Sequence, residues 1–181
     1  MHSAIGNELT ETAGDWIESA LHVQGAYVHV PFCFHKCHYC DFYSIVGDSE
    51  GQTAFVKRLV GEIEFVGTHM NSPLSTIFIG GGTPTLLEGP LLTKMLECIA
   101  SNLPMSNDVE WTVEANPETV TSDTAARLAG AGVNRISIGS QSFNEDCLTA
   151  LERWHEPSSV QRSVEHLRTG GIENINIDLI F

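Results

Sequence analysis

The feature that most constrains the fold of this chain is a repeated alternation of short apolar strands with helical segments. The expected strands span residues 26–30, 75–79, 109–115, 135–139 and 175–181, and the expected helices span 53–69, a segment from about 90, 121–129 and 158–168. Strands that alternate with helices usually form a parallel sheet joined by right-handed crossovers. The sequence therefore predicts an α/β protein made of repeated βα units.

Most of the expected strands have one apolar and one polar face, and this pattern favours a barrel over a flat sheet. Val113 alternates with Glu114, and Ile177 alternates with Asp178. A parallel sheet covered by helices on both sides should be apolar on both faces. A curved sheet with helices outside and a polar, ligand-filled interior fits better. We therefore expect a partial (β/α) barrel with about five parallel strands.

The length of the chain, 181 residues, indicates one domain with a substantial core. A whole (β/α)8 barrel takes about 250 residues, and this sequence ends at Phe181 inside an apolar strand. We therefore expect a C-terminally truncated barrel. Residues 1–20 are expected to be a polar leader, with a short helix near 15–21, and residues 21–181 one incomplete core domain.

Charge and composition exclude several classes of partner. The formal net charge is -14, from 9 basic and 23 acidic residues, which argues against binding nucleic acid or anionic lipid. No apolar run reaches the ~18–20 residues of a membrane span, and the acidic N-terminus does not read as a secretory signal. The five cysteines do not form a disulfide-like pattern. They suit a reducing compartment, so we expect a cytoplasmic protein.

Three of these cysteines, Cys33, Cys37 and Cys40, follow the first expected strand with the spacing C-x3-C-x2-C. Thiolates this closely spaced usually hold a metal. A structural zinc site or an ordinary four-iron cluster takes four ligands, so three cysteines on a [4Fe-4S] cluster would leave one iron open. Structural zinc, with His35 or His38 as a fourth ligand, is the alternative.

The segment from Tyr27 to Tyr43 contains the pattern Y-x-H-x-P-F-C, which ends at Cys33. This segment resembles the radical S-adenosylmethionine (SAM) superfamily. More narrowly, it is similar to oxygen-independent coproporphyrinogen III oxidases and the related heme chaperones. The resemblance extends over residues 27–181. It implies a barrel of the radical SAM type, a [4Fe-4S] cluster on the three cysteines, and SAM at the open iron. In the family an external reducing electron donor reduces the cluster, which then forms a 5′-deoxyadenosyl radical from SAM.

A glycine-rich segment, Gly80-Gly81-Gly82-Thr83-Pro84, follows the second expected strand. Such a loop lets the backbone approach a ligand closely and offers it N–H groups. An ordinary βα turn is the alternative. The resemblance implies that Gly81, Gly82 and Thr83 contact the methionine end of SAM.

Four polar residues lie near the expected carboxyl ends of strands, where (β/α) barrels carry their working residues. By resemblance, these SAM contacts are Glu114, Gln141, Arg153 and Asp178. Acidic groups suit ribose hydroxyls or an amino group, and arginine suits a carboxylate. Each residue taken alone would more often be a solvated or capping residue. Tyr27 and Tyr39 match family positions that line the cluster and SAM, although aromatic residues here could equally belong to the core.

One departure from the family pattern bears on function. The oxidases typically have a further cysteine two positions after the third, and this chain has Phe42 there. The sequence Cys-Asp-Phe-Tyr is the form found in the heme chaperones, whose heme-binding segment lies further downstream. We therefore expect a heme chaperone that binds heme and transfers it to apo-proteins. The alternatives are a coproporphyrinogen III dehydrogenase acting on a porphyrinogen, and a zinc-stabilised binding module.

Overall fold

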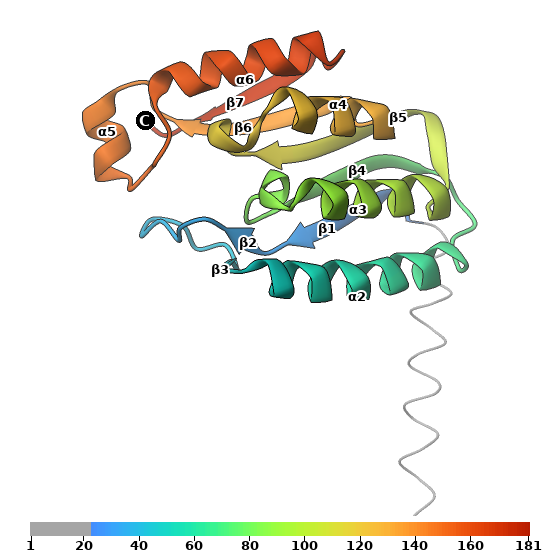
Figure 1. Ribbon diagram of the computed structural model, residues 1–181. Coiled ribbons are helices and arrows are strands. Elements are labelled where there is room, and N and C mark those ends of the chain that lie inside the picture. Colours follow the sequence, from blue (N-terminus) through green and yellow to red (C-terminus); the bar gives the residue numbers. More distant parts are fainter. Residues whose placement is uncertain (1–22) are drawn as a thin grey trace, which may run out of the picture.

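A computed structural model describes residues 23–181, so the expected leader at 1–20 and the short helix at 15–21 lie outside the described residues. The structure contains a five-stranded parallel sheet in the order β1-β4-β5-β6-β7 (Figure 1). Its strands are β1 (Gly25–Val30), β4 (Leu74–Gly81), β5 (Met105–Ala115), β6 (Arg135–Gln141) and β7 (Asn174–Leu179). All four strand pairings are parallel, which confirms the α/β fold expected from the sequence.

The helices connect these strands and form a layer along one side of the sheet (Figure 1). They are α2 (Ser49–Gly67), α3 (Gly89–Asn102), α4 (Ser122–Ala131), α5 (Glu145–Ala150) and α6 (Pro157–Thr169). Two single turns, η1 (Pro84–Leu86) and η2 (Pro117–Thr119), follow β4 and β5. Within the described residues the sheet does not close on itself, because β1 and β7 are its two edges. The architecture is therefore a partial (β/α) barrel, as the alternating strand pattern predicts.

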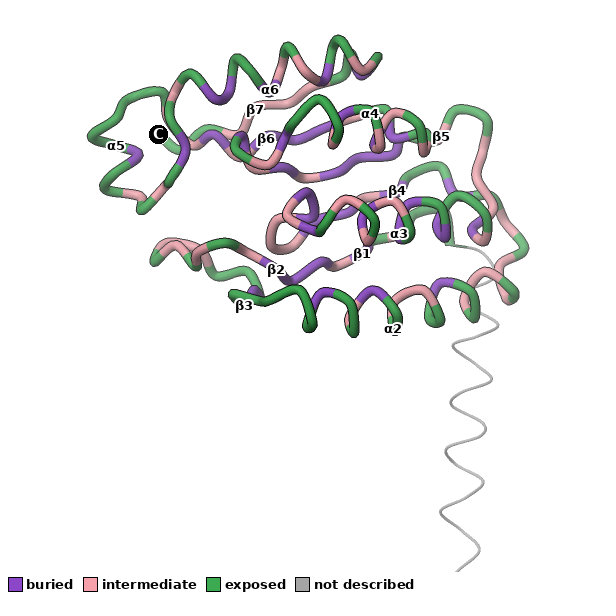
Figure 2. The backbone as a smooth tube through the Cα atoms, viewed as in Figure 1, coloured by how far each residue is buried: buried purple, intermediate pink, exposed green. Residues whose placement is uncertain are grey.

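The hydrophobic core lies between the sheet and the helices (Figure 2). Its largest fully buried side chains come from both layers: Leu74, Ile77, Ile79, Leu92, Met95, Leu96, Ile99, Trp111, Leu128, Ile136 and Ile138. The opposite face of the strands is polar, since Glu114, Ser137 and Asp178 line a cavity. Successive residues of a strand point to opposite faces of the sheet, so the alternating pattern in the sequence identified both faces.

The boundaries of the elements differ from the sequence expectation in a few places. β5 begins at Met105, four residues before the expected start, and β7 ends at Leu179. Helix α5 was not expected, because its six residues are too few to show a helical period. Asn144 caps this helix by accepting a hydrogen bond from the N–H of Cys147 at 3.0 Å.

Candidate cofactor-binding site

The three cysteines lie on one loop that leaves β1 and returns to it. We call residues 33–43 the cluster loop. Its base is closed by a short parallel pairing of β2 (Phe32–Cys33) with β3 (Ile45–Val46), and the N–H of Ile45 donates to the carbonyl of Pro31 at 2.8 Å. His29 Nε2 donates to the carbonyl of Tyr43 at 2.9 Å. The loop is therefore a closed ring whose two ends are fixed beside the end of β1.

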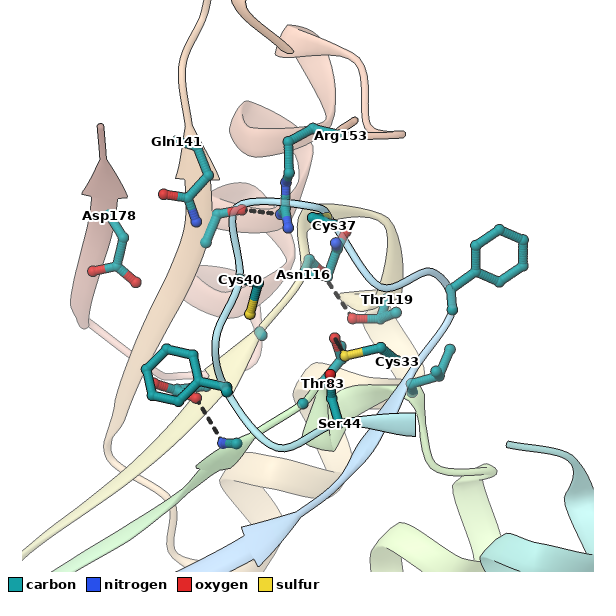
Figure 3. A pocket seen from close by; sticks show the side chains of 18 of the residues that line it. Cys33, Cys37, Cys40, Ser44, Thr83, Asn116, Thr119, Gln141, Arg153 and Asp178 are labelled. Atoms are coloured by element: carbon teal, nitrogen blue, oxygen red, sulfur yellow. Dashed lines mark hydrogen bonds between the residues drawn. The ribbon is translucent and has the colours of Figure 1, made fainter. Parts of the chain in front are cut away.

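Cys33, Cys37 and Cys40 line one cavity of about 950 Å³ at the carboxyl ends of the strands. All three thiols are free and half-buried. Figure 3 shows Cys33 and Cys40 facing the space that the cluster loop encloses. The hydroxyl of Thr83 lies 4.0 Å from Cys33 Sγ. Free thiols grouped at the wall of a polar cavity have the chemistry that an iron–sulfur cluster with an open iron requires.

The two histidines of the zinc alternative are engaged elsewhere. His35 Nε2 donates to Glu152 Oε2 at 3.0 Å, and His38 Nδ1 lies 3.4 Å from the same oxygen. Across residues 23–181, no three His, Cys, Asp or Glu side chains converge at the spacing of a single metal ion. A tetrahedral zinc site needs four such ligands about 2 Å from the metal. In this structure both histidines are thus paired with Glu152.

The glycine-rich loop at the end of β4 lies directly beneath the cluster loop. Gly81 has a left-handed backbone, with φ of 109°, and a Cβ on Gly82 would lie 2.6 Å from the carbonyl oxygen of Phe32. The close approach is therefore between two loops of the protein. The N–H groups of Gly82 and Thr83 donate to the carbonyls of Val30 and Phe32, at 2.8 and 2.7 Å.

This pairing corrects one sequence expectation. The N–H of Gly81 donates to Glu114 Oε2 at 3.0 Å, so all three main-chain donors expected for a ligand are used within the protein. The loop is drawn into pairing with the segment after β1 because both follow neighbouring parallel strands. Gly81, Gly82 and Thr83 still line the cavity. Their assignment as SAM contacts remains a prediction, with the Thr83 hydroxyl as its most direct polar group.

Glu114 reaches the cavity from the end of β5 and is part of its lining. Burial raises the pKa of this carboxyl above its usual range, and the charge of Asp178 raises it further. The Gly81 N–H and His29 favour the ionised form and oppose the rise in pKa. Glu114 is thus a hydrogen-bond acceptor held in a partly dry site beside the glycine loop.

Strands β6 and β7 and the segment between α5 and α6 place the other predicted residues around the same cavity. Asp178 on β7 accepts hydrogen bonds from Ser137 Oγ at 3.0 Å and from Asn176 Nδ2 at 2.6 Å. Gln141 ends β6 with a φ of 67°. Arg153 donates from Nη2 to the carbonyl of Gly139. Figure 3 shows Gln141 and Asp178 across the cavity from Cys33 and Thr83.

Two polar atoms at this cavity are buried without a hydrogen-bond partner among residues 23–181: Ser44 Oγ and Arg153 Nε. Buried polar groups are normally paired, so an unpaired guanidinium donor and an unpaired hydroxyl indicate a polar ligand. A guanidinium is suited to a carboxylate, which SAM carries. The residues present therefore fit both groups that the resemblance implies, a cluster at the thiols and SAM beside it.

The two predicted tyrosines have different surroundings. Tyr39, on the cluster loop, lines the cavity, and burial raises its pKa while Arg153 opposes that rise. Tyr27 is 57% exposed and is not part of the cavity lining. Its ring stacks on Phe78 with centroids 6.1 Å apart, and its hydroxyl lies 3.0 Å from His29 Nδ1. Tyr27 thus supports His29, which holds the end of the cluster loop. A direct contact of Tyr27 with cofactor stays a prediction.

Sequence reasoning missed several residues that the fold brings to the cluster loop. Glu152 and Trp154 lie between α5 and α6, contact the cluster loop and line the cavity beside it, and Phe34 stacks edge-on against Trp154. Asn116, which caps η2, and Thr119, which ends it, also line the cavity. No periodicity or spacing marks Glu152 or Trp154. Asn116-Pro117 at the end of a strand is a signal that could have pointed to η2.

The fold and this site define a class of protein: the model of the radical SAM superfamily matches residues 27–181, so the chain belongs to that superfamily. The superfamily implies a [4Fe-4S] cluster and SAM. The cysteine loop, the glycine loop and the polar strand ends all lie within the matched residues.

Particular relatives narrow the resemblance to the heme chaperone branch. The chain is 41% identical over 156 residues to the heme chaperone HemW of Lactococcus lactis, covering 86% of this chain and 40% of the relative. It is also 41% identical to HemW of Escherichia coli over 156 residues, covering 85% and 41%. The structure of the coproporphyrinogen III oxidase HemN of Escherichia coli superposes with a TM-score of 0.83 at 26% identity, covering 93% of this chain and 40% of that one. The chain therefore spans about two fifths of the length of these proteins.

Within residues 23–181, the helices are too short or too polar to cross a membrane.

Proposed function

We propose that this chain binds a [4Fe-4S] cluster through Cys33, Cys37 and Cys40 and holds SAM in the adjoining cavity. The observation that supports this proposal is the shared cavity, into which three free thiols and the polar ends of β4 to β7 open. When bound, the cluster and SAM would supply one-electron reductive chemistry. The protein's part is to bind, orient and shield them.

The roles of individual residues follow from their chemistry. Arg153 carries the unpaired guanidinium donor and is suited to the carboxylate of SAM. Glu114 and Asp178 offer carboxylate oxygens to an amino group or ribose hydroxyls, and hydrogen bonds to neighbouring residues fix both side chains. Gln141 and Tyr39 complete the wall near Arg153. A ligand enclosed on these sides would lose water from its polar groups, which strengthens each hydrogen bond.

We further propose that the protein acts as a heme chaperone, which binds heme and transfers it to apo-proteins in the cytoplasm. The identity of 41% to heme chaperones favours this role, and so does Phe42 at the position where the oxidases typically have a cysteine. The alternative is oxidative decarboxylation of coproporphyrinogen III. The structural likeness to HemN keeps it as the second candidate.

The cluster is tested by anaerobic reconstitution of the whole chain. We expect about four iron and four sulfide ions per chain, and loss of both in Cys33→Ala, Cys37→Ala and Cys40→Ala. Cys147→Ser is the matched control, because its thiol is exposed on α5 and lies outside the cavity. Iron that persists in all three alanine variants, or zinc without sulfide in the wild type, would exclude the proposed site.

The chaperone role is tested separately from the cluster. Because the heme-binding segment of the heme chaperones lies further downstream than these residues, the heme titration uses a full-length protein that includes that segment. Its absorbance should show saturable binding at about one heme per protein, and the heme should then pass to an apo-protein. Coproporphyrinogen III should be recovered unchanged after incubation with the reconstituted protein, SAM and a reductant. Turnover of the porphyrinogen would overturn the chaperone role in favour of the oxidase.

A further inference from the structure

A set of contacts at the wall of the cavity joins the middle of the cluster loop to the segment between α5 and α6, and Glu152 and Trp154 of that segment line the cavity themselves. Glu152 Oε2 accepts hydrogen bonds from His35 Nε2 at 3.0 Å and from the main-chain N–H of His38 at 3.2 Å. The thiol of Cys37 lies 3.6 Å from the main-chain carbonyl oxygen of Glu152. One residue thus contacts three of the four positions from His35 to His38.

Aromatic rings extend this contact along the rim. Trp154 meets Phe34 edge to face, with ring centroids 5.4 Å apart, and its ring lies 5.6 Å from that of His35. Trp154 is 67% exposed and lines the mouth of the cavity together with Phe34 and His35, so the stack adds nothing to the core. The polar contacts of Glu152 and the stacking of Trp154 therefore hold the same short stretch of the loop.

The backbone at Glu152 is unusual. Its φ is 53°, and among the described residues only Gln141 shares a positive φ without being glycine. A side chain is disfavoured in this left-handed region, where glycine is the residue without strain. The chain therefore carries a carboxylate at a position whose backbone favours glycine. That carboxylate contacts the cluster loop.

We propose that Glu152 is a positioning residue that holds the cluster loop closed before the cluster binds, with Trp154 supporting it from the rim. The loop is fixed at its base by the β2–β3 pairing and His29, and Glu152 supplies the missing point of attachment near its middle. A loop ordered in advance loses less conformational entropy when a ligand binds. The purpose of this attachment, which is to prepare the loop for a cluster, rests on the proposed function. The expected effect of Glu152 on the order of the loop rests on the contacts alone.

The first test measures hydrogen exchange in the metal-free whole chain by mass spectrometry. In Glu152→Ala, amides of residues 34–42 should exchange about tenfold faster, since loss of a hydrogen bond to a charged group has an effect of this size. Glu152→Gly should accelerate exchange equally, although it relieves the backbone. If the role of Glu152 were only to shape its own turn, glycine would preserve protection of the loop.

The control is Asp123→Asn on α4. This change removes another exposed carboxylate, whose Oδ2 lies 2.7 Å from Arg127 Nε. Exchange in residues 34–42 should match the wild type in this variant. Unchanged exchange in both Glu152→Ala and Glu152→Gly would overturn the proposal.

A second test uses the partner of Glu152. The effects of Glu152→Ala and His35→Ala on loop exchange should be clearly non-additive, because either change breaks the same hydrogen bond. Full additivity would contradict a shared contact. After reconstitution, Glu152→Ala should lose iron to a chelator several-fold faster than Asp123→Asn. A wild-type chain that takes up no iron would refute the cluster site alone, because the exchange measurements judge the role of Glu152 without metal.

Discussion

At the scale of single residues, the shape of the cavity depends on two positions, Gly82 and Glu114. Gly82 has the carbonyl of Phe32 where a side chain would begin, and Glu114 is held in a partly dry site by the N–H of Gly81. Each of these residues fixes the distance between the glycine loop and its neighbours. Substitutions at them should therefore affect folding stability and loop position together.

Replacing Gly82 with alanine should destabilise the chain by about 1–3 kcal/mol, because the new methyl group overlaps backbone atoms that have little room to move. Gly130→Ala is the matched control. No atom lies within 4 Å of its added Cβ, and alanine in a helix is favoured by about 0.5–1 kcal/mol. Urea denaturation of both variants provides the measurement. Equal stability of the two would mean that the glycine loop can move away from β2.

Glu114 should give stability a recognisable pH dependence. Its pKa is raised in the folded chain, so the unfolded chain releases this proton at a lower pH than the folded chain does. The stabilisation from the protonated form is complete below the unfolded pKa of about 4.3 and is lost as pH rises through the folded pKa. Glu114→Gln removes this loss. The melting temperature of the variant relative to wild type should therefore increase between pH 4 and pH 7, and a difference that shrinks with pH would contradict the assignment.

At the scale of elements, the connections after β5 and β6 fit together around one buried histidine. His155 is 4% exposed, and neither ring nitrogen has a hydrogen-bond partner among the described residues. Glu118 of η2 accepts hydrogen bonds from the Ser159 hydroxyl and the N–H of Glu156, at the start of α6. These contacts fix α6 against η2. They also anchor the segment that carries Arg153 and Glu152.

Burial and, to a smaller extent, the nearby charge of Arg153 together lower the pKa of His155 to about 4, against an opposing effect of Glu118. The neutral ring therefore stabilises the fold fully above the unfolded pKa of about 6.5, and this contribution is lost as pH falls toward 4. His155→Leu cannot take up the proton. Thermal melts from pH 7 to pH 5 should show a smaller fall in melting temperature for this variant than for wild type. Parallel falls would show that His155 is accessible to protons in the folded chain.

The helix that follows the cluster loop, α2, depends on the capping residue just before it. Asp48 accepts a hydrogen bond from the N–H of Gly51 at 2.8 Å and so caps α2. Asp48→Ala should cost about 1 kcal/mol of folding free energy, while Asp48→Asn should cost much less because asparagine caps equally well. Chemical denaturation of the two variants measures the difference. Equal losses would indicate that the charge, and not the cap, is what matters.

At the scale of the whole molecule, one apolar layer supports one polar cavity. The helices cover the outer face of the sheet, and the strand ends converge on the cluster loop (Figures 1 and 3). Lysine and arginine are sparse, with 9 basic against 23 acidic residues. The long-range field of the molecule therefore repels polyanions, whatever small molecule the cavity holds.

We accordingly expect no binding of nucleic acid by the whole chain. Fluorescence anisotropy of labelled single-stranded and duplex DNA should stay flat at about 0.15 M salt, where binding depends on cationic side chains that neutralise phosphates. A saturable rise in anisotropy that weakens as salt increases would contradict this expectation and would reveal a local cationic site.

The sequence by itself determined the fold class, the two faces of the strands and the cysteine loop, because each is encoded by local spacing. Period-2 alternation marked Glu114 and Asp178 for the interior, and the C-x3-C-x2-C pattern predicted a metal site on the loop after the first strand. Only the tertiary structure decided the partners of these groups. It paired the glycine loop's N–H groups with β1, β2 and Glu114, and it brought Glu152 and Trp154 against the cluster loop. These contacts join residues that are far apart in the chain, so they depend on how the strands are ordered in the sheet, and no local pattern carries that information.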